Sequence, residues 1–233
     1  MADRPALVLA AGLLCDADVW RPVADLLEDV AEARIVDFIG CRSIGEMADR
    51  LLRATPGRFA LAGHSMGARV ALEAFARAPD RIDRLALLNT GIHPLRTGEP
   101  EARATLVDIA RTKGMTAVAA EWLPPMMGKL GHENAALMRS LTEMVERSTP
   151  DTFAGQIHAL VDRPDAEAAL TRVAVPTLLL SATEDRWSPP EQHEAMLTLA
   201  PHAKLVIVQN AGHMAPVEQP EAVAAALRAW LAA

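Results

Sequence analysis

The chain has 233 residues, of which 51% are hydrophobic and 23% charged, a balance typical of a globular protein rather than a disordered one. Its formal net charge of −7 argues against a nucleic-acid partner, because nucleic-acid surfaces need clustered basic residues. Two cysteines are too few for the disulfide framework of a small secreted scaffold.

The N-terminal apolar run from Ala6 to Cys15 is the one stretch that resembles a targeting segment. Asp3 offsets the charge of Arg4, and the run lacks the basic start and the length of a secretory leader. No apolar run reaches the roughly 20 residues that a transmembrane helix needs. We therefore expect a cytoplasmic protein that has no membrane partner and acts as a monomer or a homodimer.

Short β-branched and leucine-rich runs alternate along the chain with longer segments of helical period. The predicted strands are 6–10, 34–38, 58–62, 84–89, 177–181 and 204–208. The predicted helices are 19–30, 43–54, 66–78, 190–199 and 220–231. Ser43 and Glu46 have the spacing of a capping box, and Pro220 suits the first position of the last helix. This alternation predicts an α/β protein with a mostly parallel sheet flanked by helices.

The alternation is interrupted once, between Gly91 and Val173, where only helical patterns and turn residues occur. A structureless loop of this length is improbable inside a compact domain. We therefore predict that residues 1–92 and 174–233 form the core, and that residues 93–173 form an inserted helical cap over the strand ends.

The pentapeptide Gly63-His64-Ser65-Met66-Gly67 lies directly between a predicted strand and a predicted helix. In that context a G-x-S-x-G motif is typical of a nucleophile elbow, a sharp turn that exposes the serine hydroxyl. The glycines remove side chains that would collide in the turn, and the following helix directs its positive end toward developing negative charge. Ser65 is the predicted nucleophile; an incidental serine in a glycine-containing turn is the alternative.

A serine nucleophile needs a base, and the base needs a third group to orient it. His213 follows the last predicted strand and is the predicted base, with a surface loop histidine as the alternative. Asp185 follows the preceding strand and is the predicted acid. Glu184 stays a competitor, because sequence does not fix the geometry of a loop. The order Ser65, Asp185, His213 is the order of the α/β-hydrolase motif.

With these residues in place, the chain resembles the α/β-hydrolase family, in particular small bacterial carboxylesterase-like members with a helical cap. The resemblance covers nearly the whole core. Residues 9–14 resemble the family's first-strand loop, and residues 212–221 resemble its catalytic-histidine loop running into the last helix. Ala11 replaces the usual histidine and Ala182 the usual glycine, which affects loop geometry rather than the chemistry.

The resemblance implies a serine hydrolase that cleaves a small carboxylic ester through an acyl-enzyme, without a cofactor. The oxyanion hole is expected at the backbone N–H groups of Met66 and Leu13, with Leu14 as a neighbouring alternative to Leu13. Hydrolysis of a lactone (an enol-lactone) and hydrolysis of a carbon–carbon bond are the enzymatic alternatives. A ligand-binding protein without activity, built on the same fold, is the alternative from another class.

The cap is expected to set substrate specificity. The predicted substrate-binding residues are Leu14, Trp122, Met126, Met127 and Trp187. Methionine suits adaptable apolar surfaces, and a stiff proline pair precedes Met126. These residues predict that the site accepts an apolar acyl or alcohol group.

The remaining reactive side chains are given structural roles. His64 lies beside the predicted nucleophile, but a side chain on a sharp turn points away from its neighbour, so we predict a structural or pocket-wall role. His93 is left open between pocket and surface. Cys15 and Cys41 are predicted to be packing residues. No histidine pair has the H-E-x-x-H spacing, and we predict no metal site.

Overall fold

The computed structural model describes residues 4–233, which contain a six-stranded sheet with the strand order β2-β1-β3-β4-β5-β6. Every neighbouring pair of strands is parallel. The strands are β1 (Ala6–Ala10), β2 (Glu32–Val36), β3 (Phe59–His64), β4 (Ile82–Leu88), β5 (Thr177–Ala182) and β6 (Lys204–Val208). The predicted fold class is confirmed. Because all strands run the same way, the loops that follow them emerge at one edge of the sheet.

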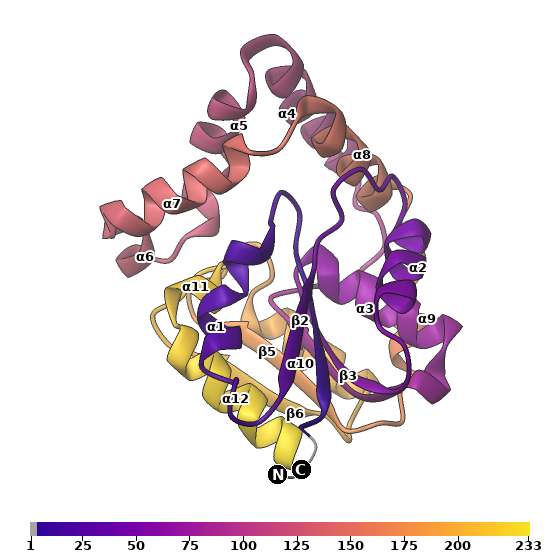
Figure 1. Ribbon diagram of the computed structural model, residues 1–233. Coiled ribbons are helices and arrows are strands. Elements are labelled where there is room, and N and C mark those ends of the chain that lie inside the picture. The colour runs from indigo at the N-terminus through magenta and orange to yellow at the C-terminus, as the bar shows by residue number, and fades with distance from the viewer. Residues whose placement is uncertain (1–3) are drawn as a thin grey trace.

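Helices cover both faces of this sheet (Figure 1). On one side α1 (Arg21–Asp25) packs against α11 (Ala215–Glu218) and α12 (Pro220–Ala232). On the other side α2 (Ile44–Ala54) packs against α3 (Met66–Arg77), and α10 (Pro190–Leu199) packs against β5 and β6. Short 3₁₀ turns occupy Ala17–Val19 and Pro79–Arg81. The sheet is therefore the middle layer of three.

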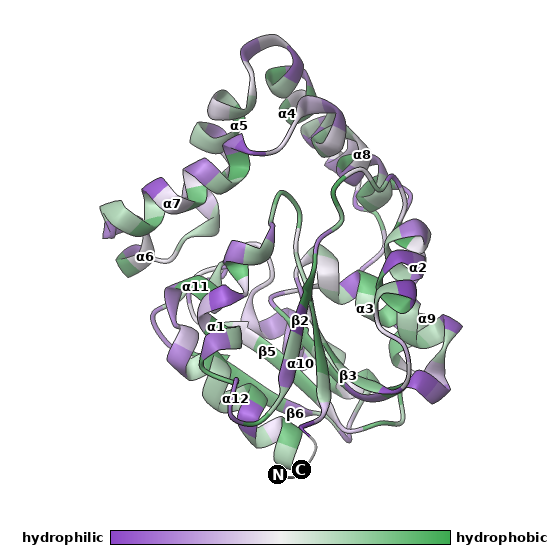
Figure 2. Ribbon diagram, viewed as in Figure 1, coloured by the Kyte–Doolittle hydropathy of each residue, from purple (hydrophilic) through white to green (hydrophobic). Residues whose placement is uncertain are grey.

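The central strands form the most buried part of the core. Every residue of β3 and of β5 is buried, whereas β2 at the sheet edge begins with three exposed residues. Figure 2 shows β3 and β5 in green between the two helix layers. Strands buried on both faces read as continuous apolar runs, which is why the central strands are predictable from sequence.

The helix predicted over residues 19–30 is wrong. The structure has a 3₁₀ turn at Ala17–Val19, a short α1 over Arg21–Asp25 and non-helical turns as far as residue 30. β2 begins at Glu32, two residues before the predicted strand 34–38. The first residues of β2 are exposed because the strand lies at the sheet edge. A prediction based on apolar runs does not detect strand residues that are exposed and polar.

The predicted cap of α2 forms with a small difference. The Ser43 hydroxyl accepts a hydrogen bond from the backbone N–H of Glu46 at 3.1 Å, as a helix N-cap requires. The Glu46 carboxylate accepts from the backbone N–H of Arg42 at 2.7 Å, one residue before the N-cap residue that a capping box uses. Two backbone donors are still satisfied at this helix start.

The described residues between β4 and β5 contain helices and no strand. They are α4 (Glu99–Lys113), α5 (Met115–Trp122), the 3₁₀ turn η3 (Pro124–Met126), α6 (Lys129–Glu133), α7 (Ala135–Glu146), α8 (Pro150–Val161) and α9 (Ala166–Leu170). Figure 1 shows α4 to α8 arching over the edge of the sheet where the strands end. α9 packs against α3, so it lies with the helices of the core although the prediction included it in the cap. The division into a core and a cap domain stays a prediction.

Gly67, at the start of α3, packs directly against the backbone at the end of β1. A Cβ atom at this position would lie 2.3 Å from the carbonyl oxygen of Ala10 and 2.6 Å from that of Ala11. Both are backbone atoms, so the methyl group of alanine would have to displace β1. We expect Gly67→Ala to cost about 1–3 kcal/mol of stability, as overpacking does. The melting temperature should then fall by about 2–4 °C per kcal/mol, and an unchanged value would contradict this contact.

Candidate active site

Ser65 occupies the turn between β3 and α3 in a strained backbone conformation, with φ 56° and ψ −117°. A side chain in this region costs on the order of 1–3 kcal/mol and persists only where the surroundings enforce it. Here the Ser65 N–H donates to the Leu88 carbonyl at 2.9 Å, and the Thr90 hydroxyl donates to the Ser65 carbonyl at 3.0 Å. A Cβ on Gly63 would lie 2.3 Å from the carbonyl oxygen of Gly67, so the turn needs that glycine.

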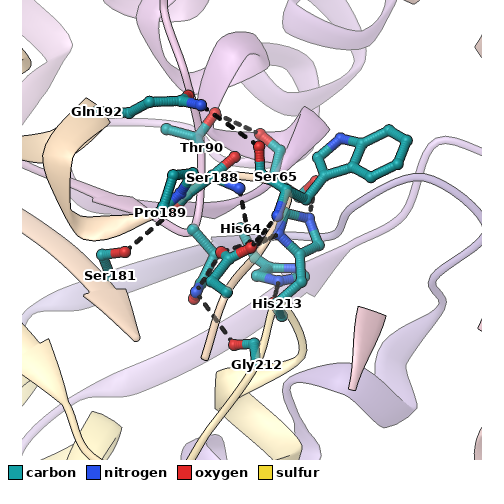
Figure 3. Close-up of polar contacts among 12 residues, drawn as sticks. His64, Ser65, Thr90, Ser181, Ser188, Pro189, Gln192, Gly212 and His213 are labelled. Carbon is teal, nitrogen blue, oxygen red and sulfur yellow. Dashed lines mark hydrogen bonds and ion pairs between the residues drawn. The ribbon is translucent and has the colours of Figure 1, made fainter. Parts of the chain in front are cut away.

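The imidazole of His213 lies between Ser65 and Asp185. Its Nε2 atom is 2.8 Å from the Ser65 hydroxyl oxygen. Its Nδ1 atom is 3.0 Å from Oδ2 and 3.1 Å from Oδ1 of Asp185. Figure 3 shows the side chains of Ser65 and His213 directed toward each other. Three residues from the loops after β3, β5 and β6 thus form one hydrogen-bonded series.

Asp185 is almost fully buried, and each of its oxygens is held by a further donor. Oδ1 accepts from the backbone N–H groups of Trp187 and Ser188 at 2.9 and 2.8 Å. Oδ2 accepts from the side-chain amide of Asn89 at 3.0 Å. Burial on its own would raise the pKa of Asp185, but His213 and these donors outweigh it and hold that pKa well below its ordinary value. The carboxylate is therefore ionised at neutral pH.

Glu184, the alternative acid, takes part in a different contact. Its carboxylate accepts from the backbone N–H of Lys129 at 2.6 Å, and its own N–H donates to the Ala211 carbonyl at 2.9 Å. Within the described residues it makes no hydrogen bond to His213. The geometry therefore favours Asp185 over Glu184 as the partner of the imidazole.

His64 is buried behind the site and outside the cavity lining. Its Nε2 is 2.7 Å from the carbonyl oxygen of His213. A carbonyl only accepts, so Nε2 carries the hydrogen and donates it. Burial, and then the neighbouring His213, lower the pKa of His64 to about 3, so the ring is neutral. This neutral donor holds the His213 backbone, in line with the structural role predicted for His64.

Two residues beside Ser65 have a backbone N–H group without a hydrogen-bond partner among the described residues. Neither Leu13 nor Met66 donates a backbone hydrogen bond within residues 4–233, and both residues line the cavity beside Ser65. The Leu14 N–H, in contrast, donates to the side-chain oxygen of Gln156 at 3.0 Å. Leu14 has a φ of 59°, in the left-handed region. Leu13 and Met66 are thus the free donors, and Leu14 is engaged elsewhere.

A cavity of about 290 Å³ opens beside Ser65 and His213. Three of the predicted substrate-binding residues line it: Trp122, Met126 and Trp187. Leu14 and Met127 do not. Leu14 lines a smaller hollow beneath α7 and α8, and Met127 lines a separate surface depression. Met127 follows Met126, the last residue of η3, at the point where the chain leaves that turn in extended backbone with φ −92° and ψ 143°.

The cavity is far more charged than the predicted apolar site. Five arginines and one glutamate contribute to its lining: Arg69, Arg96, Arg103, Arg163, Arg186 and Glu99. His93, whose place the sequence leaves open, also lines it. The arginines are scattered along a chain of net negative charge, so neither composition nor a local motif indicates that they converge.

Glu218 ties the loop carrying His213 to the segment after η3, and sequence analysis gives it no role. Its two carboxylate oxygens accept from the backbone N–H groups of Gly212 at 2.9 Å and Gly128 at 2.7 Å. The His213 N–H donates to the Met126 carbonyl at 2.7 Å. Burial raises the pKa of Glu218 to about 6. The position of the imidazole thus depends on contacts with the segment between α5 and α6.

Replacing Glu218 by glutamine should loosen this loop. An amide offers one acceptor oxygen where the carboxylate offers two, so one buried N–H loses its partner at a cost of about 1–3 kcal/mol. We expect Glu218→Gln to lower the melting temperature by several degrees and to lower kcat, measured by thermal unfolding and steady-state kinetics. Glu221→Gln, an exposed change three residues later, is the matched control. Equal behaviour of the two variants would contradict the role of Glu218.

Residues 4–233 contain no group of three or more side chains placed to hold a metal ion. Cys15 and Cys41 are buried and unpaired with each other, and burial raises the pKa of the Cys15 thiol to about 12. No helix in this part of the chain has both the length and the apolar character needed to cross a membrane.

Comparison with known proteins gives consistent relatives. A putative carbamate hydrolase, RutD, of Pseudomonas syringae is 26% identical over 99% of this chain and 95% of its own length. A pimeloyl-[acyl-carrier protein] methyl ester esterase of Nitrosomonas europaea is 25% identical over 94% of this chain and 92% of its own. The structure of a thermophilic esterase from Thermogutta terrifontis has a TM-score of 0.89 and 28% identity, covering 98% of this chain and 89% of that one.

The family assignment rests on nearly the whole chain. The sequence profile of the alpha/beta hydrolase family matches residues 7–226, a span that includes every strand of the sheet except the first residue of β1. An enol-lactonase from Burkholderia xenovorans shares the fold, with a TM-score of 0.91 at 24% identity over 100% of this chain and 93% of that one. The chain is therefore a hydrolase that belongs to the alpha/beta hydrolase family.

Proposed function

We propose that this protein is a serine hydrolase that cleaves a small carboxylic ester through an acyl-enzyme. Ser65 is the nucleophile, His213 the general base and acid, and Asp185 the residue that orients His213. The observation that carries the proposal is the 2.8 Å contact between the Ser65 hydroxyl and Nε2 of an imidazole whose Nδ1 faces an ionised carboxylate. A serine hydroxyl without such a base is a weak nucleophile.

In the first half of the reaction, the Ser65 oxygen forms a bond to the carbonyl carbon of the ester, and its proton passes to Nε2 of His213. The carbonyl oxygen takes the electron pair of the π bond and becomes an oxyanion. The bond to the alcohol oxygen then breaks, and the alcohol leaves with the proton from Nε2. Throughout, the buried Asp185 carboxylate stabilises the imidazolium and keeps Nδ1 protonated.

In the second half, water replaces the alcohol. His213 takes a proton from the water as its oxygen attacks the acyl carbon, and a second oxyanion forms. The bond to Ser65 breaks, the serine oxygen recovers its proton from Nε2, and the carboxylic acid is released. The enzyme returns to its starting state without consuming a cofactor.

The oxyanion is assigned to the backbone N–H groups of Leu13 and Met66. Both are unpartnered within the described residues, and Met66 begins α3, whose positive end lies at the site. Donors of this kind contribute about 3 kcal/mol each to transition-state stabilisation. Because they are main-chain groups, side-chain substitution at either position would alter the cavity without deleting a donor.

The names of the relatives support acyl transfer to water. One is described as a methyl ester esterase and one as a putative carbamate hydrolase. Esters, lactones and carbamates all present a carbonyl carbon with an oxygen or nitrogen leaving group, so the same nucleophile and oxyanion donors serve each of them. We place carboxylic esters first, because esterases occur among both the sequence relatives and the solved structures.

A fluorophosphonate probe tests the nucleophile without knowledge of the natural substrate. We expect the folded protein to be labelled and heat-denatured protein to remain unlabelled. A panel of p-nitrophenyl esters of increasing acyl length, with lactones and an aryl carbamate beside them, then ranks the substrate classes. A folded protein that neither reacts with the probe nor turns over any member of the panel would point to a ligand-binding protein and contradict the proposal.

A further inference from the structure

Arg69 is a buried cation beside the proposed nucleophile. It lies in the first turn of α3, four residues after Ser65 in the sequence. The residue is only 9% exposed, and it lines the cavity. Among the described residues its side chain makes one hydrogen bond, from Nη2 to the carbonyl oxygen of His93 at 3.0 Å. Within residues 4–233 no carboxylate lies within ion-pair distance of it.

Two further arginines of the same cavity, both with little exposed side chain, share a single carboxylate. Glu99 accepts from Arg163 at 2.7 and 2.9 Å and from Arg103 at 2.9 Å. The side chain of Arg163 is 3% exposed and that of Arg103 12%. The Arg163 Nε atom is buried without a hydrogen-bond partner. Three guanidinium groups therefore face one acidic group in this part of the cavity.

This arrangement leaves positive charge uncompensated on a side chain that is almost fully buried. A buried charge without a partner is costly, and native proteins pair such charges or bind an ion to them. Burial, and then the charge of Arg163, lower the pKa of Arg69 to about 9, which reflects how poorly the site tolerates another cation. A guanidinium presents parallel N–H donors that match the two oxygens of a carboxylate.

We propose that the substrate of this enzyme carries a carboxylate remote from the scissile ester, and that Arg69, flanked by Arg103 and Arg163, binds it. The inference rests on the serine hydrolase function proposed above. Glu99 already displays the geometry in which a carboxylate meets two of these arginines. Leu13, Trp122 and Met126 line the same cavity and supply apolar surface for the carbon chain between ester and carboxylate.

Matched ester pairs test the preference directly. Hydrogen p-nitrophenyl succinate, glutarate and adipate place a carboxylate on the acyl side, and p-nitrophenyl pentanoate and its homologues are the neutral partners. Acetate esters of ω-hydroxy acids, compared with alkyl acetates, place it on the alcohol side. We expect kcat/KM in at least one series to favour the anionic ester by on the order of 10- to 100-fold, mainly through KM, as expected for a charge-assisted hydrogen bond.

Variants assign the preference to Arg69. Arg69→Met should remove most of the ratio between anionic and neutral esters, and Arg69→Lys should retain part of it. Arg21→Met is the matched control, because Arg21 is an exposed arginine outside the cavity. The ratio of kcat/KM for anionic and neutral esters should be the same in this variant as in the unaltered enzyme. Increasing ionic strength should raise KM for the anionic ester more than for the neutral one.

Glutarate binding provides a readout that does not need turnover or a folded variant. We expect glutarate to raise the melting temperature of the unaltered protein more than inorganic phosphate does. On a substrate that is turned over, glutarate should also inhibit competitively. Hydrolysis of neutral esters with no anionic preference in either series would overturn this proposal and leave the hydrolase function standing. Tighter binding of phosphate than of glutarate would overturn the choice of carboxylate. Absence of all turnover would instead contradict the proposed function, and glutarate binding would still test the anion site.

Discussion

Replacing Ser65 by alanine is expected to lower kcat for a p-nitrophenyl ester by about a million-fold, the loss seen when a serine hydrolase loses its nucleophile. The reason is that the Ser65 oxygen forms the bond to the acyl group. Among the described residues, no other hydroxyl group both lines the cavity and lies within 2.8 Å of an imidazole nitrogen. The residual rate should be that of direct attack by water on the bound ester, assisted only by the oxyanion donors.

The variant should keep its fold, because the Ser65 side chain makes no hydrogen bond other than the one to His213 among the described residues. Thermal unfolding monitored by circular dichroism checks this point. Ser148→Ala, a serine outside the cavity, controls for the substitution itself and should leave the rate unchanged. If Ser65→Ala retained more than a few per cent of the activity, another group would have to be the nucleophile.

Asp185→Asn is expected to lower kcat by about ten thousand-fold, a smaller loss than that for Ser65. Asparagine fills the same space, but its amide bears no charge to stabilise the imidazolium and can leave His213 in the wrong tautomer. It also loses the second oxygen, which accepts from the side-chain amide of Asn89, and places an NH2 group against that amide instead. Single-turnover kinetics measured beside thermal unfolding separate the chemical loss from the structural one.

Glu184, the adjacent acid, provides a control for the Asp185 experiment. Glu184→Gln changes a carboxylate one residue away that contacts the Lys129 backbone instead of His213, and its effect on kcat should remain below tenfold. A larger loss for Glu184→Gln than for Asp185→Asn would reverse the assignment of the acid.

The low pKa of Asp185 adds a pH signature. A carboxyl group whose pKa is lower in the folded state than the ordinary 3.8 stabilises the fold above pH 3.8, and this contribution is lost as the pH falls toward the folded pKa. The difference in stability between the unaltered protein and Asp185→Asn should therefore shrink in acid. Chemical unfolding at pH 7 and at pH 3 measures it.

The sequence was sufficient to predict the central strands and the three residues that meet at the sheet edge. Parallel strands buried on both faces are long apolar runs, and their carboxyl ends share one edge by geometry. The positions of Ser65, Asp185 and His213 relative to those ends therefore follow once the strands are located. A sequence pattern does not give distances. The structure gives them, as 2.8 Å between Ser65 and His213 and 3.0 Å between His213 and Asp185.

Side-chain direction and long-range convergence were beyond sequence reasoning. Leu14 and Met127 follow cavity residues directly in the sequence, yet each lines a different hollow. Arg69 donates to a residue 24 positions away in the sequence, and Glu218 joins a residue six positions away to one 90 positions away. Only the packing of α4 to α8 over the sheet brings such groups together.

The most direct test of the account is the mass of the enzyme during turnover. A slowly deacylating p-nitrophenyl ester, mixed with the protein and quenched in acid within milliseconds to seconds, should yield a species heavier by one acyl group. Peptide mapping should place that group on Ser65, and the Ser65→Ala protein should carry none. Efficient hydrolysis with no acylated species under single-turnover conditions, or an acyl group mapped to another residue, would contradict the mechanism.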